Sequence, residues 1–397
     1  MGAREHFVVV GASLAGLRGA EALRAAGYDG RITVVGGEGR LPYNRPPLSK
    51  KILTGEQVIE EVSFPIAEDL DVDWRLGAPA TGLDVARRQV SLGDGGTVDY
   101  DRLLIATGVS PVVPAIPGRD LAGVYILRDV EHALALRRDL VPGRSLVILG
   151  AGFIGCEVAA SARQMGLDVT IVDRLAWPMN RVMGEEMAGL FRAIHEEQGV
   201  RFHMGREVVA LKGEGAVTGV ELDGGEVLKA DVVLVGVGSR PAVQWLEGSG
   251  LVLQNGVVCD AACRATNGDG RIAAAGDVAA WPHLGFGGEV MRMEHWTNAF
   301  EQGAAAALAL IAETPEPYLP LPSFWSDQYA YKIQALGRPS ATDSATVTAG
   351  SLEARKFVVE YGNDAGVTGV LSVNMPARMA GYRRDMGAQI LARAGRA

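Results

Sequence analysis

The sequence predicts an α/β fold with two Rossmann-like dinucleotide-binding domains and a small α+β C-terminal domain. The first observation is a pair of glycine fingerprints, roughly 140 residues apart, each between a short apolar run and an Ala-rich segment typical of a helix. The second is a proline-dense linker at 314–320, beyond which strand-like runs replace the alternating strand and helix pattern. One fingerprint is weak evidence, but two at domain spacing indicate two dinucleotides and therefore electron transfer.

Composition narrows the class of protein. The 397 residues are 48% hydrophobic and 21% charged, as expected for a globular chain of two or three domains. Without a membrane-length apolar run or an export signal, we expect a cytoplasmic protein that does not bind a membrane. The net charge of −9 argues against a general nucleic-acid binder. The spacing of Cys156, Cys259 and Cys263 suits neither a redox pair nor a metal site, so we expect three buried small apolar groups.

The first fingerprint is Gly11-x-Ser13-x-x-Gly16, with serine in place of the middle glycine. Serine is small enough to keep the backbone open to a pyrophosphate, and the helix that follows offers free N–H groups and a positive dipole end. A predicted strand at 31–35 precedes Glu38, whose carboxylate could accept hydrogen bonds from ribose hydroxyls or be a solvated loop group.

The second fingerprint, Gly150-x-Gly152-x-x-Gly155, has all three glycines. Asp173 ends the next predicted strand, where a carboxylate accepts hydrogen bonds from both ribose hydroxyls and repels a 2′-phosphate. This favours NADH over NADPH. Arg174 follows directly and could contact that phosphate, so the choice of nicotinamide stays open.

Two further segments point to a cofactor. Prolines stiffen the loop at 41–50 and present Arg45 and Lys50 as fixed cations, although ordinary surface charge is the alternative. A short apolar strand at 271–275 ends in Gly276-Asp277, where the aspartate could bind a cofactor hydroxyl or cap a helix.

The loop Pro42-Tyr43-Asn44-Arg45-Pro46-Pro47-Leu48-Ser49-Lys50 resembles that of the oxygenase-coupled NADH-dependent ferredoxin reductases, the FAD flavoproteins similar to putidaredoxin reductase and biphenyl dioxygenase reductase. Further matches lie in family order over nearly the whole chain: Leu104-Ile105-Ala106-Thr107-Gly108, Ala275-Gly276-Asp277-Val278, Arg292-Met293-Glu294-His295-Trp296-Thr297-Asn298-Ala299 and Phe324-Trp325-Ser326-Asp327-Gln328.

The resemblance implies a glutathione-reductase-like fold with FAD and NADH as cofactors. It implies an FAD-binding domain at 1–112 and 245–318, an NAD-binding domain at 113–244 and a C-terminal interface domain at 319–397. Lys50 would lie beside the flavin ring, and Glu157 would lie at the nicotinamide and pair with Lys50; these two are the predicted catalytic residues.

The same resemblance assigns the other binding residues. Those expected around FAD are Gly11, Ser13, Leu14, Ala15, Gly16, Glu38, Arg45, Lys50, Ala80, Ala106, Thr107, Gly108, Arg128, Gly276, Asp277, Glu294, His295 and Trp296. Those expected around NADH are Gly150, Gly152, Phe153, Ile154, Gly155, Glu157, Asp173, Arg174, Arg181, Gly236, Val237 and Gly238.

Three positions depart from the family pattern. Gly37 stands where the family usually has aspartate, and Asn44 replaces an acid in the loop, which leaves Arg45 with one charge partner fewer. Both departures bear on the affinity for FAD. Trp177 replaces a family arginine, which weakens the case for NADPH.

The implied function is electron transfer from NADH through FAD to a 2Fe–2S ferredoxin that serves a cytochrome P450 or a Rieske oxygenase. Residues 36–60 contain no cysteine, so the sulfur centre of disulfide reductases and NADH peroxidases is missing. A rubredoxin or quinone reductase is an alternative, as is an NADH-sensing flavoprotein resembling apoptosis-inducing factor. The sequence identifies neither the particular ferredoxin nor the oxygenase, and a monomer and a homodimer remain open.

Residues 320–397 carry nine Lys and Arg against six Asp and Glu, a positive balance that suits an acidic ferredoxin. Trp325 is expected near the flavin edge or its docking face, or as a buried anchor. The candidate basic contacts are Lys332, Arg338, Arg378, Arg383 and Arg384.

Overall fold

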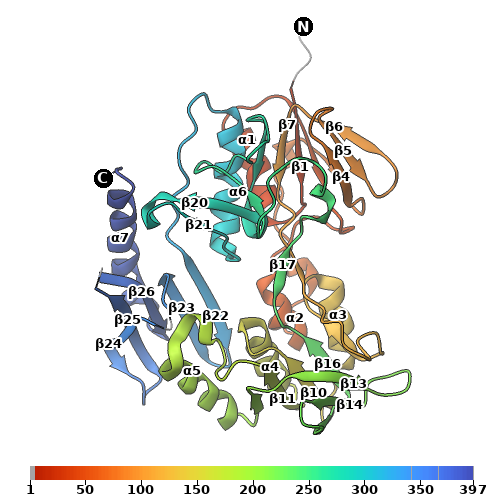
Figure 1. Cartoon of the computed structure of the whole chain (residues 1–397), viewed down its shortest axis with the longest axis vertical. Helices are drawn as coiled ribbons and strands as arrows, with labels where there is room; N and C mark the ends of the chain where they lie inside the picture. Colours follow the sequence, from red (N-terminus) through yellow and green to blue (C-terminus); the bar gives the residue numbers. More distant parts are fainter. Residues whose placement is uncertain (1–4, 341, 365, 397) are drawn as a thin grey trace.

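The computed structural model describes residues 5–340, 342–364 and 366–396. Figure 1 shows three lobes: an upper one around β1, a lower one around β10, and a third beside both that ends in α7. Each of the first two lobes is built on a five-stranded parallel sheet.

The upper sheet has the strand order β19-β7-β1-β2-β3. Its apolar strands are buried on both faces, as parallel sheets require. They are β1 (His6–Val10), β2 (Arg31–Val35), β7 (Arg102–Ile105) and β19 (Ile272–Ala274), whereas the edge strand β3 (Val72–Arg75) is partly exposed. The helices α1 (Leu14–Ala25) and α6 (Trp296–Ile311) pack against each other in this lobe, although they lie far apart in the sequence. A Cβ at Gly303 would collide with the Ala15 carbonyl, so only glycine permits this close approach.

The lower sheet has the order β12-β11-β10-β16-β9. Its strands are β9 (Val124–Ile126), β10 (Ser145–Leu149), β11 (Asp168–Asp173), β12 (Arg201–Met204) and β16 (Val232–Val235). The helices of this part of the chain are α3 (Val130–Asp139), α4 (Phe153–Gln164) and α5 (Asn180–Glu197).

Smaller elements surround the two parallel sheets. Two three-stranded antiparallel sheets are formed by β4 (Ala80–Asp84), β5 (Gln89–Leu92) and β6 (Thr97–Asp99), and by β13 (Val208–Lys212), β14 (Gly219–Leu222) and β15 (Val227–Lys229). The remaining strands are β8 (Val109–Pro111), β17 (Ser239–Pro241), β18 (Val257–Val258), β20 (Ala279–His283) and β21 (Glu289–Met291). The chain crosses between the two lobes at the β8–β17 pair, and the short helix α2 (Lys51–Thr54) follows the proline-stiffened loop.

The third lobe is a five-stranded antiparallel sheet covered by one helix. Its order is β22-β23-β26-β25-β24. The elements are β22 (Ser323–Gln328), β23 (Tyr331–Gly337), β24 (Ser344–Ser351), β25 (Lys356–Asn363), β26 (Gly366–Val373) and α7 (Pro376–Arg393). The sequence predicts only the last three strands and the helix, so β22 and β23 are corrections. A hydrophobicity pattern does not predict β22 because the residues that it buries are polar. They are Ser323, Ser326 and Gln328.

The architecture agrees with the predicted fold class of two Rossmann-like domains and a small α+β domain. All three cysteines are free and buried, as expected. Within the described residues, no helix is both long and apolar enough to cross a membrane, and no group of His, Cys, Asp and Glu side chains is arranged to hold a metal ion. The domain boundaries at 112, 244 and 318 stay predictions.

Among the polar contacts that join the lower lobe to the third lobe, one involves a buried histidine. His195 of α5 is fully buried, and its Nε2 lies 2.9 Å from Oε1 of Gln328 in β22. Burial lowers the pKa of His195 from 6.5 to about 4. The ring is therefore neutral at physiological pH.

This burial predicts an acid-sensitive stability. Between pH 6.5 and about 4 the unfolded chain binds a proton at His195 that the folded protein does not bind, so the free energy of unfolding falls as the pH falls through this window. We expect His195→Gln to remove roughly 3 kcal/mol of that loss, measured by urea unfolding across the window. An unchanged pH dependence in the variant would contradict a neutral buried histidine.

Candidate active site

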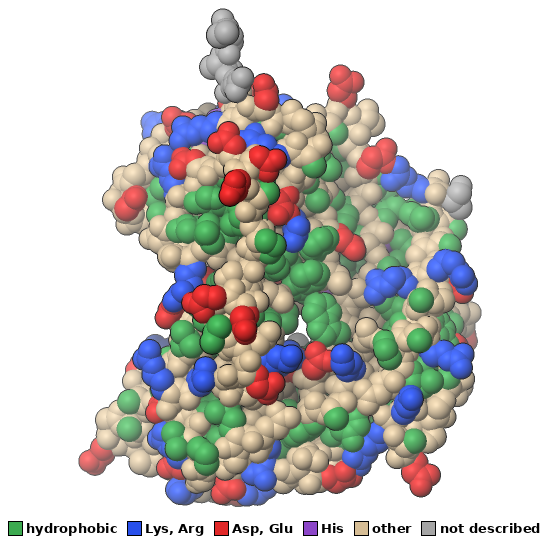
Figure 2. All heavy atoms as spheres, turned by 180° about the vertical axis from the view of Figure 1, so that it is seen from behind, with side chains coloured by type: hydrophobic (Ala, Val, Ile, Leu, Met, Phe, Trp, Pro, Cys, Tyr) green, Lys and Arg blue, Asp and Glu red, His purple; other side chains and the backbone are tan. Residues whose placement is uncertain are grey.

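Each glycine fingerprint lies at a point where the strand order of its sheet reverses. Strand β1 has β2 on one side and β7 on the other, and β10 lies in the same way between β11 and β16. Crevices at the carboxyl ends of such strands are where open α/β sheets bind ligands. Figure 2 shows the surface hollowed between the upper and lower lobes.

The first fingerprint fits a pyrophosphate. Gly11 has a φ of 126°, and a Cβ there would collide with the Ala106 carbonyl; a Cβ at Gly16 would collide with the Gly11 carbonyl. Ser13 begins α1, and its side chain makes no capping hydrogen bond. The N–H groups of the first turn, which includes Leu14 and Ala15, can therefore face an anion.

The second fingerprint has the same geometry with a more open middle position. A Cβ at Gly150 would collide with the Gly236 carbonyl, and one at Gly155 would collide with the Gly150 carbonyl. A Cβ at Gly152 would meet no atom within 4 Å. Two of the glycines are thus required by packing, whereas Gly152 leaves space beside the start of α4 that a pyrophosphate could occupy.

Asp173 ends β11 beside this turn. Its Oδ2 accepts a hydrogen bond of 2.7 Å from the Ala151 N–H, and its Oδ1 accepts one of 2.8 Å from the Leu175 N–H. Each carboxylate oxygen keeps a further lone pair, so the group can still accept from ribose hydroxyls. Arg174 is exposed, and the side chain of Arg181 lies outside the described residues.

The loop after β2 supplies a partly buried ion pair to the first site. Glu38 is paired with Arg45 through Oε1, and its Oε2 accepts a hydrogen bond of 2.5 Å from the Tyr43 hydroxyl. Arg45 also donates to the Ser13 hydroxyl at 3.3 Å and lies over the Tyr43 ring. Glu38 therefore serves Arg45 as the carboxylate partner that position 44 does not provide. Asn44 has a different contact, because its Oδ1 accepts a hydrogen bond of 2.9 Å from Trp296 Nε1.

A second partly buried arginine, Arg128, lies next to Arg45. The Arg45 guanidinium donates to the Arg128 carbonyl at 2.8 Å, and the Arg128 guanidinium lies 3.6 Å from Asp277 Oδ2. Burial and the charge of Arg45 lower the pKa of Arg128, and burial raises the pKa of Asp277 despite the nearby arginine. The two guanidinium groups lie near each other, each with one carboxylate partner, and their remaining N–H groups could donate to a phosphate. The residues therefore fit an FAD pyrophosphate.

Lys50 and Glu157 meet between the two fingerprints. Lys50 Nζ lies 2.6 Å from Glu157 Oε2, so the loop that precedes α2 meets α4 at this point. The carboxylate also accepts hydrogen bonds of 2.6 Å each from the Ser49 and Ser326 hydroxyls. Glu157 is only 6% exposed, so these three donors replace the water that would otherwise solvate its charge.

Aromatic side chains lie at the start of α6. Trp296 stacks on Phe300 with ring centroids 5.3 Å apart and meets Trp325 of β22 edge-on at 5.7 Å. The neighbouring His295 contacts Phe324, which packs on Phe153 of α4. Burial lowers the pKa of His295 to about 4, and its Nδ1 has no hydrogen-bond partner in the described part of the chain. A neutral ring nitrogen without a partner is consistent with a bound polar ring nearby.

The other predicted residues lie at the edges of the same region. Ala80 begins β4, and Ala106, Thr107 and Gly108 follow β7, where the Thr107 hydroxyl donates to the Ala242 carbonyl at 2.9 Å. Gly276 follows β19, and its N–H donates to Gln302 Oε1 at 2.9 Å. Glu294 pairs with Arg292 at 2.7 Å and accepts hydrogen bonds from the Ser239 hydroxyl. Ile154 of α4 and Val237, between Gly236 and Gly238, are about half exposed.

Sequence reasoning missed several side chains that hold these groups in place. Ser49 and Ser326 donate to Glu157, and Tyr43 donates to Glu38. All three lie inside segments whose order matched the family pattern, so their position in a motif was the available signal. Nothing in the sequence indicates that their hydroxyls point to carboxylates more than 100 positions away in two of the three cases.

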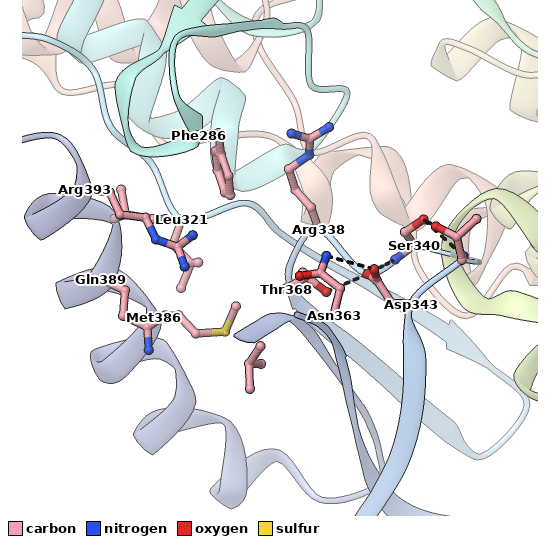
Figure 3. Close-up of a pocket in the computed structure, with 13 residues that line it drawn as sticks. Phe286, Leu321, Arg338, Ser340, Asp343, Asn363, Thr368, Met386, Gln389 and Arg393 are labelled. Carbon is pink, nitrogen blue, oxygen red and sulfur yellow. Dashed lines mark hydrogen bonds between the residues drawn. The ribbon is translucent and has the colours of Figure 1, made fainter. Parts of the chain in front are cut away.

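A cavity of about 340 Å³ lies apart from this region, in the third lobe beside α7. Figure 3 shows Met386, Gln389 and Arg393 of α7 together with Phe286, Leu321 and Arg338. None of the residues predicted to bind FAD or NADH lines it, although Arg338, a predicted ferredoxin contact, does. The cavity is therefore separate from both fingerprints.

Fold and site together define an oxidoreductase with two dinucleotide sites and no disulfide. Residues 5–303 match the family described as pyridine nucleotide-disulphide oxidoreductase, and residues 323–397 match the family described as reductase C-terminal. The chain belongs to the pyridine nucleotide-disulphide oxidoreductase family, and it carries the reductase C-terminal domain. The resemblance stated from the motifs is confirmed, and the predicted cofactors, FAD and NADH, agree with this family.

Relatives and solved structures match nearly the whole chain. Rhodocoxin reductase of Rhodococcus erythropolis is 36% identical over 97% of this chain and 90% of its own length. The biphenyl dioxygenase system ferredoxin–NAD(+) reductase component of Paraburkholderia xenovorans strain LB400 is 35% identical over 97% and 94%. In the crystal structure of the covalent putidaredoxin reductase–putidaredoxin complex, the matching chain has a TM-score of 0.92 and 31% identity, covering 98% of this chain and 94% of that one.

The two kinds of glycine in the second fingerprint predict opposite phenotypes. Gly152→Ala adds a methyl group that meets no protein atom, so we expect native stability and NADH binding weakened by at least about tenfold, because the methyl group takes the space of the pyrophosphate. Gly155→Ala forces a Cβ into a backbone carbonyl, so we expect a destabilisation of roughly 2 kcal/mol or more. Thermal unfolding and NADH titration of the two variants check both. Equal stability of the two variants would contradict this division.

Proposed function

We propose that this protein is an NADH-dependent ferredoxin reductase that passes electrons through FAD to a 2Fe–2S ferredoxin, which serves a cytochrome P450 or a Rieske oxygenase. The observation that carries the proposal is the Lys50–Glu157 pair, which lies between the two glycine fingerprints of a chain whose three cysteines are all free and buried. The names of the relatives support the same acceptor, because one is a ferredoxin–NAD(+) reductase component of a dioxygenase system.

The chemistry of electron transfer belongs to the cofactors. FAD, when bound, accepts a hydride from NADH and can release the two electrons one at a time. The protein supplies orientation and charge. Lys50 would stabilise negative charge on the reduced flavin ring, and Glu157 holds the Lys50 ammonium in position while its own orientation is fixed by Ser49 and Ser326.

Cysteine chemistry is not available at this site, although Cys156 directly precedes Glu157. The Cys156 side chain is fully buried, its thiol donates weakly to the Ala151 carbonyl at 3.7 Å, and burial raises the pKa of the thiol well above its usual range. A protonated thiol is a poor nucleophile and a poor redox partner. A thiol of this chain would therefore not carry electrons between FAD and the acceptor.

The arrangement around Asp173 supports NADH as the donor. Its carboxylate is held by two backbone N–H groups at the edge of the second fingerprint, where it would repel a 2′-phosphate. Arg174, the residue that could attract such a phosphate, is exposed. We infer a preference for NADH over NADPH.

The partner is proposed to be an acidic ferredoxin that docks near Trp296 and Trp325. Of the predicted basic contacts, Arg338 is paired with Glu289 at 2.6 Å and Arg384 with Asp385 at 2.8 Å, which reduces their attraction for a partner. Lys332, Arg378 and Arg383 are exposed and are the stronger candidates. We place this reaction in the cytoplasm, with the protein as a monomer or homodimer.

Lys50→Ala tests the role of the pair. We expect the limiting rate of flavin reduction by NADH to fall about 100-fold, because the variant loses a charge that acts at the reacting ring. FAD content should stay native, since Arg45 and Arg128 hold the phosphates. The matched control is Lys51→Ala, at an exposed neighbour. Stopped-flow absorbance under anaerobic conditions measures the rate, and native kinetics in Lys50→Ala would remove the assigned role.

The acceptor is tested by coupled turnover. We expect NADH-dependent reduction of cytochrome c to rise at least about tenfold when an acidic 2Fe–2S ferredoxin is added, and to weaken with rising salt because opposite charges steer the encounter. A rubredoxin and a soluble quinone are the comparison acceptors. Faster turnover with either would assign the alternative acceptor, and slow turnover with all three would favour an NADH sensor.

A further inference from the structure

A chain of buried hydrogen bonds leads away from Glu157 into the third lobe and back to the lower lobe. The Ser326 hydroxyl donates to Glu157 Oε1 at 2.6 Å, and Gln328 Nε2 donates to the Ser326 oxygen at 3.1 Å. Gln328 Oε1 lies 2.9 Å from His195 Nε2, and His195 Nδ1 lies 3.1 Å from the Tyr329 hydroxyl. Ser326, Gln328 and His195 are each at most 1% exposed.

The chemistry of the groups gives every bond in this chain one direction. Gln328 Nε2 also lies 3.7 Å from Met179 Sδ, which can only accept a hydrogen bond, so the amide nitrogen faces Ser326 and the amide oxygen faces His195. Because burial keeps the His195 ring neutral, Nε2 carries the proton that Gln328 accepts. Nδ1 then accepts from Tyr329. All the donors therefore point toward the Glu157 carboxylate, and hydrogen bonds aligned in this way strengthen one another.

The chain also reaches the second fingerprint. Met179 accepts from Gln328 through its sulfur, and its own N–H donates to the Ala151 carbonyl at 3.0 Å, between Gly150 and Gly152. The same glutamine thus contacts the group that holds Glu157 and the segment beside the predicted NADH pyrophosphate. Apolar side chains would suffice to pack α5 against β22, so packing does not explain why these positions carry polar groups.

We propose that Ser326, Gln328 and His195 are positioning residues that hold Glu157 in the orientation in which it pairs with Lys50. The inference rests on the proposed function of that pair. His195 fixes the orientation of the Gln328 amide by donating to its oxygen. If the amide turned over, it would present its oxygen to Ser326, and the Ser326 hydroxyl would donate to Gln328 instead of Glu157. The Glu157 carboxylate would then lose one of its three donors. It would also lose the orientation in which it pairs with Lys50.

Kinetics of the FAD-loaded protein test whether Ser326, Gln328 and His195 position Glu157. We expect the limiting rate of flavin reduction by NADH to fall about tenfold in Ser326→Ala, which removes one donor to a charged group. His195→Leu should lower it severalfold. The NADH dissociation constant from the same stopped-flow series should change by less than about twofold. His195→Gln keeps a donor at the Nε2 position, and we expect it to restore most of the rate.

Three outcomes would overturn the proposal: a native limiting rate in Ser326→Ala, an equal loss in His195→Leu and His195→Gln, or a loss confined to NADH affinity. An equal loss in the two His195 variants would indicate that His195 acts only through packing. Thermal unfolding of all three variants identifies any that do not fold. If NADH does not reduce the flavin of the native holoenzyme, the proposed function fails. If NADH reduces the native enzyme and the variants at the same rate, only the positioning role of these residues is removed.

The protonation of the His195 ring tests the direction of these hydrogen bonds independently of activity. Nitrogen-15 NMR of histidine-labelled protein, assigned by comparison with His195→Gln, should show a protonated Nε2 and an unprotonated Nδ1 at neutral pH. The same tautomer is expected with and without NADH. A protonated Nδ1 would mean that His195 donates to Tyr329 and not to Gln328, which would contradict the proposal.

Discussion

The site depends on a buried carboxylate that must be supplied with donors. Glu157 sits in the first turns of α4 with almost no access to water, and a charge in such a place is tolerated only when hydrogen bonds and an opposite charge replace its hydration. The donors come from Ser49 and Lys50, whose loop packs against α3 and α4 of the lower lobe, and from Ser326 of the third lobe. The electrostatic requirement of one side chain thus joins the loop before α2 and the strand β22 of the third lobe to α4.

A second constraint is steric, and it sets how closely the backbones approach. Gly11 and Gly150 each face the carbonyl of a neighbouring strand end at a distance that admits no Cβ, and Gly303 does the same between α1 and α6. These contacts bring the ends of β1 and β7, and of β10 and β16, together at the reversal of strand order. Gly152 differs because space lies beside it. The glycines therefore divide into those that build the crevice and one that leaves it open.

Much of the fold could be predicted because its signals are local. The two fingerprints, the strands that precede them and the acid at the end of β11 each follow from a few adjacent residues whose apolarity or backbone freedom has one structural meaning. Strand β22 could not be predicted in this way, because its buried positions carry Ser323, Ser326 and Gln328. Their burial is compensated by hydrogen bonds to other lobes, which no hydrophobicity pattern records. Asn44 is similar: its contact with Trp296 spans 252 positions.

The sequence by itself determined that two dinucleotide-binding units exist, that residues 36–60 contain no cysteine, and that Lys50 and Glu157 belong to motifs. These properties depend on residue type and short spacing alone. Only the tertiary structure decided that Lys50 meets Glu157, that Ser326 joins them, and that Arg45 takes Glu38 as its partner. The packing of the lobes brings together side chains that are distant in the sequence. Because burial removes water from a charged group, that group then needs a partner among these side chains.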